Sequence, residues 1–193
     1  KIGDFECSAM LEQEVSELPN TFAKAALIAK EVGFTGVQIH AGHGFLLSQF
    51  LSPLFNRRED QYGGSIEARC KVIIDIVSKV RDTVGNSFPI GIKINCTDQL
   101  QGGLTEKDAL VAIGLLDKTS IDLIELSGGS YFPGAESSSD SLTKGPYFID
   151  FSSKAKKITN IPIAVTGGFK TREEAINTLH KNTSDMVGIA RAF

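Results

Sequence analysis

The chain of 193 residues has 41% hydrophobic and 22% charged residues, which is typical of a globular protein and enough to bury one sizeable core. Its net charge of -3 offers no basic surface for nucleic acid or an anionic membrane. No apolar stretch approaches the roughly 20 residues that a membrane span needs, and the first residues carry no signal-peptide pattern. We expect a single domain over residues 1–193 that binds neither nucleic acid nor membrane.

The three cysteines, Cys7, Cys70 and Cys96, are odd in number and lack the spacing of metal ligands. They indicate buried or free thiols in a reducing compartment, so we expect a cytoplasmic protein without a metal site. The composition does not decide between a monomer and an oligomer.

Helical segments separate five strand-like runs of the sequence. Successive side chains of a strand point to opposite sides, so the apolar residues of each run can face covering helices while polar residues share the other face. Polar groups near strand C-termini are typical of a barrel with a site at its top. The runs are Gly36–Ala41, Pro89–Asn95, Ile121–Ser127, Ile161–Gly167 and Met186–Ala190. The polar residues of the second face are Gln38, His40, Lys93, Asn95, Glu125, Ser127 and Thr166.

Apolar residues at three- and four-residue spacing predict five helices. Ser65 and Thr105 are placed to cap two of them, and Thr171 opens a T-x-x-E capping box. Gly33 and Gly85 mark two helix ends. The expected helices are Asn20–Val32, Ser65–Val84, Thr105–Leu116, Ser152–Ile158 and a segment that begins at Thr171.

Two connections are longer than the usual βα loop of roughly 2 to 6 residues. Gly42–Gly64 places about twenty residues between a strand and its helix, and its large apolar side chains argue against disorder. Gly128–Asp150 contains the run ESSSDS and is expected to be the more mobile of the two. Both follow strand C-termini, which places them on the catalytic side of a (β/α) barrel.

A long motif begins at the end of the first strand. His40 and His43 form H-x-x-H, and Asn56 to Arg69 reads N-x-R-x-D-x-Y-G-G-S-x-E-x-R. This stretch resembles the Old Yellow Enzyme family of FMN-dependent oxidoreductases, which includes ene-reductases and NADH:flavin oxidoreductases. The resemblance continues through GIKIN, ELSGG, VTGGF and GIAR, and so covers almost the entire chain.

The resemblance implies an α/β fold, the TIM (β/α)8 barrel. That barrel has about 250 residues, whereas this chain supplies only about five βα units, corresponding to strands 4 to 8. The family's first three strands, which hold much of the flavin, would lie upstream. We therefore expect the sequence to be the C-terminal part of a longer barrel.

The resemblance also assigns catalytic positions. His40 and His43 match the donors that hold an oxygen of a small electrophilic substrate over the flavin, which stabilises developing negative charge. Phe45 stands where ene-reductases usually carry the tyrosine that protonates the substrate. Since phenylalanine has no transferable proton, water or another acid would have to deliver it, and Tyr62 and Tyr131 are the candidate phenols.

FMN is the implied cofactor and NAD(P)H the implied reductant. Lys93 matches the cation at the flavin N1 and O2 edge, where it would stabilise the reduced flavin, and an ion pair with Glu125 is the structural alternative. The family holds the FMN phosphate with backbone amides and an arginine after the last two strands, the usual phosphate site of this barrel. The matching residues are Gly167, Gly168, Ala190 and Arg191, with glycine in the family where Ala190 stands.

A charged cluster in and just after the first long loop is better explained as ion pairs that pin the loop than as a substrate site. Asp98 and Gln101, beyond the Lys93 strand, read equally well as solvated loop residues. The members of the cluster are Arg57, Arg58, Glu59, Asp60, Glu67 and Arg69.

Three hypotheses remain. The first is an FMN-dependent oxidoreductase that transfers hydride from NAD(P)H via the flavin to an activated alkene, a quinone or a similar acceptor. The second is a catalytically incompetent barrel fragment without stable flavin binding. The third, a phosphate-binding barrel lyase or isomerase, would account for Gly167, Gly168 and Arg191 but not for the motif from His40 to Arg69. We adopt the first.

Overall fold

The computed structural model describes residues 8–131 and 145–189. Within them, a parallel sheet has the strand order β1-β2-β3-β4-β5, so each strand pairs with the next one along the chain. This sequential order with helical crossovers is that of a (β/α) barrel. The strands are β1 (Val37–Ala41), β2 (Ile90–Asn95), β3 (Leu123–Ser127), β4 (Ile163–Thr166) and β5 (Met186–Gly188).

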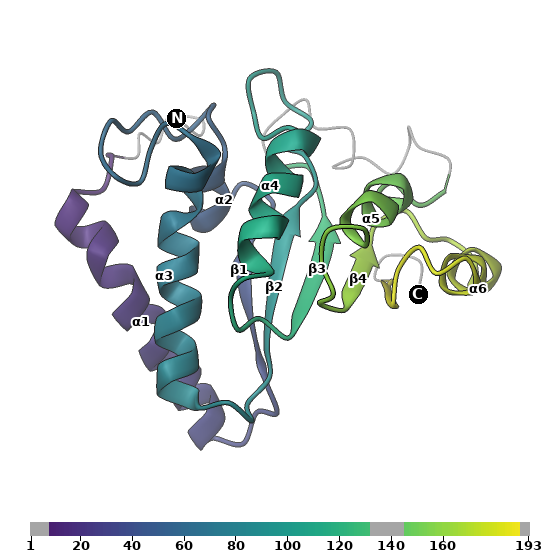
Figure 1. The fold of residues 1–193 in the computed structure, drawn as a ribbon, viewed down its shortest axis with the longest axis horizontal. Helices are drawn as coiled ribbons and strands as arrows, with labels where there is room; N and C mark the ends of the chain where they lie inside the picture. Colours follow the sequence, from purple (N-terminus) through teal and green to yellow (C-terminus); the bar gives the residue numbers. More distant parts are fainter. Residues whose placement is uncertain (1–7, 132–144, 190–193) are drawn as a thin grey trace.

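Helices connect the strands and cover one face of the sheet. Figure 1 shows α3, α4 and α5 along that face, with α1 beside α3. None of the helices among the described residues is long and apolar enough to cross a bilayer. The helices are α1 (Glu12–Glu31), α2 (Leu46–Leu51), α3 (Ile66–Val84), α4 (Glu106–Leu116), α5 (Ile149–Ala155) and α6 (Arg172–His180).

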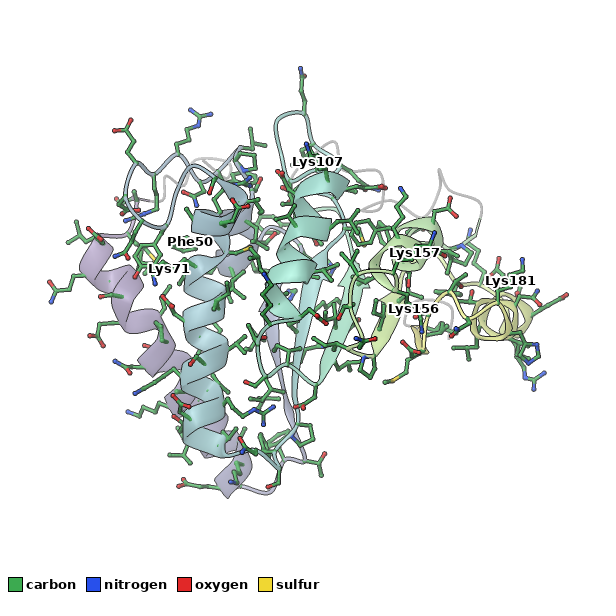
Figure 2. All side chains as sticks on the ribbon, viewed as in Figure 1. Phe50, Lys71, Lys107, Lys156, Lys157 and Lys181 are labelled. Carbon is green, nitrogen blue, oxygen red and sulfur yellow. The ribbon has the colours of Figure 1, made fainter. Side chains whose placement is uncertain are left out.

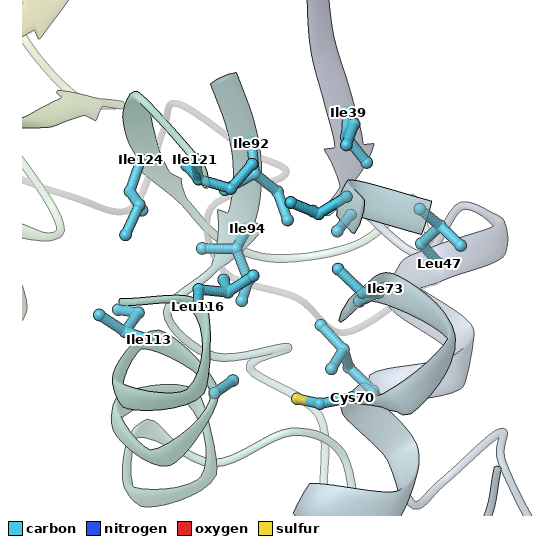
Figure 3. Packing of buried hydrophobic residues seen from close by; sticks show 14 of the residues in the cluster. Ile39, Leu47, Cys70, Ile73, Ile92, Ile94, Ile113, Leu116, Ile121 and Ile124 are labelled. Carbon is cyan, nitrogen blue, oxygen red and sulfur yellow. The ribbon is translucent and has the colours of Figure 1, made fainter. Parts of the chain in front are cut away.

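The main core lies between the sheet and these helices. Ile92 and Ile94 of β2 and Ile124 of β3 point toward Ile113 and Leu116 of α4, and all five are buried (Figure 3). Full burial of one such side chain contributes about 1.5–3 kcal/mol relative to exposure. The predicted apolar face of the strands is therefore the face that the helices cover.

The polar residues of the strands share the opposite face. His40 pairs with Lys93 in the β1–β2 register, and Lys93 pairs with Glu125 in the β2–β3 register. Side chains at paired positions of neighbouring strands point to the same side of a sheet. Most lysines, by contrast, lie on the outer helices and their connections, as Figure 2 shows for Lys107 and Lys181.

Most predicted helix boundaries agree with the structure to within a residue. The hydroxyls of Ser65, Thr105 and Thr171 accept hydrogen bonds from the first turns of α3, α4 and α6, as the sequence predicts. Gly85 ends α3 with a φ of 80°, a conformation that favours glycine. The sequence therefore encodes these helix ends locally.

Two helix predictions are wrong in their bounds. The first helix begins at Glu12 rather than Asn20, because Glu14 accepts the Leu11 N–H at 2.7 Å and Val15 packs into the core. Helix α5 begins three residues before the predicted Ser152. The reason is that apolar side chains before Ser152, such as that of Phe151, are buried and belong to the helix.

The first long loop contains a helix that the sequence did not predict. Leu46–Leu51 forms α2, whose Leu47, Phe50 and Leu51 are buried, which agrees with the expectation that this loop is ordered. The ESSSDS run of the second long loop lies outside the described residues.

Candidate active site

Two imidazoles lie side by side at the C-terminal end of β1. The ring centroids of His40 and His43 are 5.2 Å apart, with planes at 68°. His43 has a φ of 61°, and its N–H donates to Asn95 Oδ1 at 2.9 Å. Its Nε2 lies 2.8 Å from Ser127 Oγ. Residues at the ends of β1, β2 and β3 thus fix the imidazole of His43. The backbone of His43 lies in the left-handed region, which is uncommon for residues with a side chain.

Asn95 joins these strand ends. It is fully buried, and its Nδ2 donates to Asp98 Oδ1 and to the Gly129 carbonyl, each at 2.9 Å. The interpretation of Asp98 as a solvated loop residue is wrong, since it is 1% exposed and also accepts the Leu104 N–H at 2.8 Å. From the sequence, Asn95 could be recognised only as a polar residue at the end of an apolar strand. Its hydrogen-bond partners could not be predicted, because two of them, His43 and Gly129, come from distant parts of the chain.

Burial lowers the pKa of both histidines, and the nearby Lys93 ammonium lowers each further. For His43 the pKa falls to about 4. Both imidazoles are therefore neutral at pH 7, and each has one N–H to donate.

Phe45 is the first residue before α2 and is 52% exposed. Its ring centroid lies 5.2 Å from that of His40 and 5.4 Å from that of Tyr131. Of the two candidate phenols, Tyr131 is therefore the one that packs against Phe45, whereas Tyr62 is buried in the core. The aromatic rings form a continuous partly exposed surface at this edge of the sheet.

Four polar side chains meet on the open face of the sheet, one from each of β1 to β4. Glu125 Oε1 accepts from Lys93 Nζ at 2.8 Å and from Thr166 Oγ1 at 2.7 Å. Its Oε2 accepts from Gln38 Nε2 at 2.8 Å. We call Gln38, Lys93, Glu125 and Thr166 the Glu125 cluster. The ion pair that the sequence suggested as the structural alternative for Lys93 is thus present.

Burial alone would raise the pKa of Glu125, but the hydrogen bonds from Lys93, Thr166 and Gln38 outweigh it and hold the pKa below its ordinary value. The carboxylate therefore stays charged at neutral pH and has a donor on each oxygen.

The glycine pair after β4 forms a turn with positive φ at both residues. Gly167 and Gly168 have φ of 127° and 80°. Within the part of the chain that the structure describes, the Gly168 N–H donates no hydrogen bond. A Cβ at Gly168 would lie 2.4 Å from the carbonyl oxygen of Gly145, so this turn requires glycine. Ala190 and Arg191, the other predicted phosphate contacts, lie outside the described residues.

Two arginines of the charged cluster, Arg58 in the first long loop and Arg69 in α3, hold that loop in place. Arg58 pairs with Asp60 and also donates to the Met10 carbonyl. Arg69 pairs with Asp108 of α4 at 3.1 Å and donates to the Leu51 carbonyl. These contacts agree with the structural interpretation of the cluster.

Cys70 and Cys96 are buried free thiols. Burial raises the pKa of Cys70 to about 12 and that of Cys96 well above its ordinary value, so both stay protonated and unreactive. The third cysteine, Cys7, lies outside the described residues.

A family model described as the NADH:flavin oxidoreductase / NADH oxidase family matches residues 3–193. The chain belongs to this family. The match confirms the resemblance drawn from the motif and argues against the lyase or isomerase hypothesis. FMN is the flavin of this family and NAD(P)H its reductant.

Curated members of the family are similar over most of this chain. The NADH-dependent flavin oxidoreductase iliE of Hypocrea jecorina is 38% identical over 187 residues, which are 92% of this chain and 46% of that protein. The NADH oxidase of Thermoanaerobacter brockii is 29% identical and is matched over 28% of its length. The chain thus spans about half, or less, of the length of these relatives.

Solved structures of the family confirm the fold. An old yellow enzyme homologue from Zymomonas mobilis superposes with a TM-score of 0.79 at 25% identity, over 96% of this chain and 50% of that one. A 2-naphthoyl-CoA reductase gives a TM-score of 0.89 at 27% identity, over 96% of this chain and 28% of that one. The five-stranded sheet therefore corresponds to part of their TIM barrel.

Proposed function

We propose that the chain is the hydride-transfer part of an FMN-dependent oxidoreductase that passes electrons from NAD(P)H to an activated alkene, a quinone or a similar acceptor. The observation that carries the proposal is the placement of two neutral imidazoles, 5.2 Å apart, at the C-terminal edge of a barrel sheet. That edge is where barrel enzymes bind their substrates. When bound, FMN supplies the hydride chemistry that no side chain of this site has.

His40 and His43 would bind the acceptor. One N–H from each imidazole can point at the same carbonyl, nitro or quinone oxygen, where negative charge develops as hydride arrives elsewhere on the molecule. The hydrogen bond that the His43 backbone N–H donates to Asn95 Oδ1, and the contact of its Nε2 with Ser127 Oγ, fix His43 before the substrate binds. Such preorganisation lets the site stabilise charge without rearranging during the reaction.

The described residues fit FMN at two points. Lys93 has three N–H donors, of which Glu125 accepts one, so others remain for the anionic edge of a reduced flavin. The N–H of Gly168, which donates no hydrogen bond within the described residues, lies in a positive-φ turn after β4 and suits a phosphate. Lys93, Gly167 and Gly168, with Ala190 and Arg191, would hold the cofactor.

The phenylalanine at position 45 favours acceptors that need no delivered proton. An alkene requires a proton at its α-carbon as hydride reaches the β-carbon, and the Phe45 ring cannot supply one. A quinone collects its protons on oxygen, where solvent can deliver them. We therefore place quinones and molecular oxygen ahead of simple enones as acceptors.

A second candidate is favoured by the open edges of the sheet. Within the described residues, β1 and β5 each pair with one strand only, and the polar face has no covering helix. Unpaired edges of this kind promote association. A catalytically incompetent fragment without stable flavin binding, which survives only beside another chain, would have this structure.

One experiment separates the two candidates. The chain is mixed with FMN, free flavin is removed, and NADH or NADPH is added without oxygen. Loss of the yellow absorbance, followed by its return with a quinone, supports the oxidoreductase. A protein that keeps no flavin in its 193-residue form and in any longer form that contains these residues would contradict it. We call the flavin-loaded polypeptide that contains these residues the holoenzyme.

A further inference from the structure

We propose that Glu125 is a positioning residue that sets the reduction potential of the bound flavin by fixing Lys93 and offsetting part of its charge. The inference deepens the proposed function and rests on it, because it concerns the cation assigned to the flavin edge. It derives from the Glu125 cluster, in which one carboxylate ties together side chains from four adjacent strands.

Geometry favours a dedicated role for this carboxylate. Glu125 and Lys93 lie at paired positions of β3 and β2, and their side chains are only 17% and 19% exposed. Thr166 binds the same carboxylate oxygen as Lys93, and Gln38 binds the other oxygen. With a donor on each oxygen, the carboxylate has little freedom to move, so Lys93 is held at one place on the open face.

The Gln38 side chain extends across a neighbouring strand to join the Glu125 cluster. Gln38 lies on β1 and Glu125 on β3, so the amide must cross β2 to reach the carboxylate. It passes Gly91, where a Cβ would lie 3.6 Å from Gln38 Cγ. Glycine at this position leaves the path open, whereas a large side chain would block it.

The charges of the cluster act in opposite directions on a flavin. A cation beside the flavin favours the anionic reduced form, and an anion close to that cation weakens the preference. The ammonium of Lys93 is paired at 2.8 Å, so the flavin meets a largely compensated charge. Removal of the carboxylate charge would leave Lys93 uncompensated and raise the potential.

The test is the midpoint potential of the holoenzyme, measured by dye-coupled anaerobic titration. Glu125→Gln keeps the shape of the side chain and removes its charge. We expect reduced FMN to be favoured over oxidised FMN by about tenfold more than in the wild type, which is a rise of about 30 mV for a two-electron couple. Glu125→Asp withdraws the carboxylate by one methylene, so a smaller rise is expected, and this variant decides the test if Glu125→Gln does not fold.

The matched control is Glu106→Gln. Glu106 pairs with Lys154 at the same 2.8 Å, but both side chains are about half exposed on the outer helices α4 and α5. The substitution changes the net charge equally, so it should leave the potential at the wild-type value. An equal rise in Glu106→Gln would show a general charge effect and overturn the assignment to Glu125.

A second readout needs no flavin. Lys93 lowers the pKa of His40 and His43 while Glu125 raises both, so Glu125→Gln should make both imidazoles titrate at lower pH in NMR spectra of the flavin-free protein. A lower histidine pKa with an unchanged or lowered flavin potential would overturn the proposal, because Glu125 would then act on the histidines alone or serve only to hold Lys93. A protein that binds no FMN would overturn the proposed function as well.

Discussion

Phe45→Tyr is expected to accelerate reoxidation of the reduced holoenzyme by cyclohexenone about 10²- to 10⁴-fold, the usual range for general acid catalysis. The Phe45 ring centroid lies 5.2 Å from that of His40, so a phenol at this position would lie beside a carbonyl held by the histidines. The α-carbon of the enone becomes carbanion-like as hydride arrives, and a phenol can protonate it.

Stopped-flow traces of flavin reoxidation under argon would measure this rate in the parent and in the variant. Reduction by NAD(P)H and reoxidation by a quinone should be unchanged, because neither needs a proton delivered to carbon. Phe34→Tyr is the matched control, since Phe34 is 65% exposed in the connection between α1 and β1. No acceleration, or an already fast parent, would mean that another acid serves the site, and Tyr131, whose ring packs against Phe45, is the candidate phenol.

Replacement of both His40 and His43 by alanine is expected to weaken binding of a phenolic ligand at least about a hundredfold. Each hydrogen bond to a charged group contributes about 1.5–3 kcal/mol, and the variant removes two of them from the phenolate oxygen. The long-wavelength charge-transfer band of the flavin–phenol complex should disappear. The spectrum of the bound flavin should remain, because these side chains would touch the ligand rather than the cofactor.

The third histidine provides the control for that titration. His180 lies at the exposed end of α6, so His180→Ala should bind the phenol as the parent does. An unchanged titration in the double variant would exclude the histidines as ligand donors. Loss of the flavin from the double variant would instead assign them a structural role.

Local sequence patterns predicted the features that depend on local chemistry. The five strands appear within two residues of their expected ends where the structure describes them. In β1 to β4 the reason is that apolar residues are buried by the helices they face. The caps at Ser65, Thr105 and Thr171 depend on residues three positions apart, and such short-range hydrogen bonds can be inferred from a motif.

The remaining features depend on contacts between distant parts of the chain. The sequence left open whether Asp98 is a solvated loop residue, and its burial follows from bonds to Asn95 and to the backbone of Leu104, which a polar loop sequence does not reveal. The reach of Gln38 across β2 to Glu125 requires the register of three strands. Strand register of this kind is set by the whole sheet. The sequence could therefore place Gln38 and Glu125 on one face, but it could not predict the hydrogen bond between them.

The most direct test of the account is a crystal structure of the holoenzyme with a phenolic ligand. The account predicts FMN over the polar face of the sheet, with Lys93 Nζ in hydrogen-bond distance of the flavin edge and the phenol oxygen between the imidazoles of His40 and His43. The Gly168 N–H should point at the phosphate. Flavin bound elsewhere, or a ligand that contacts neither histidine, would contradict it.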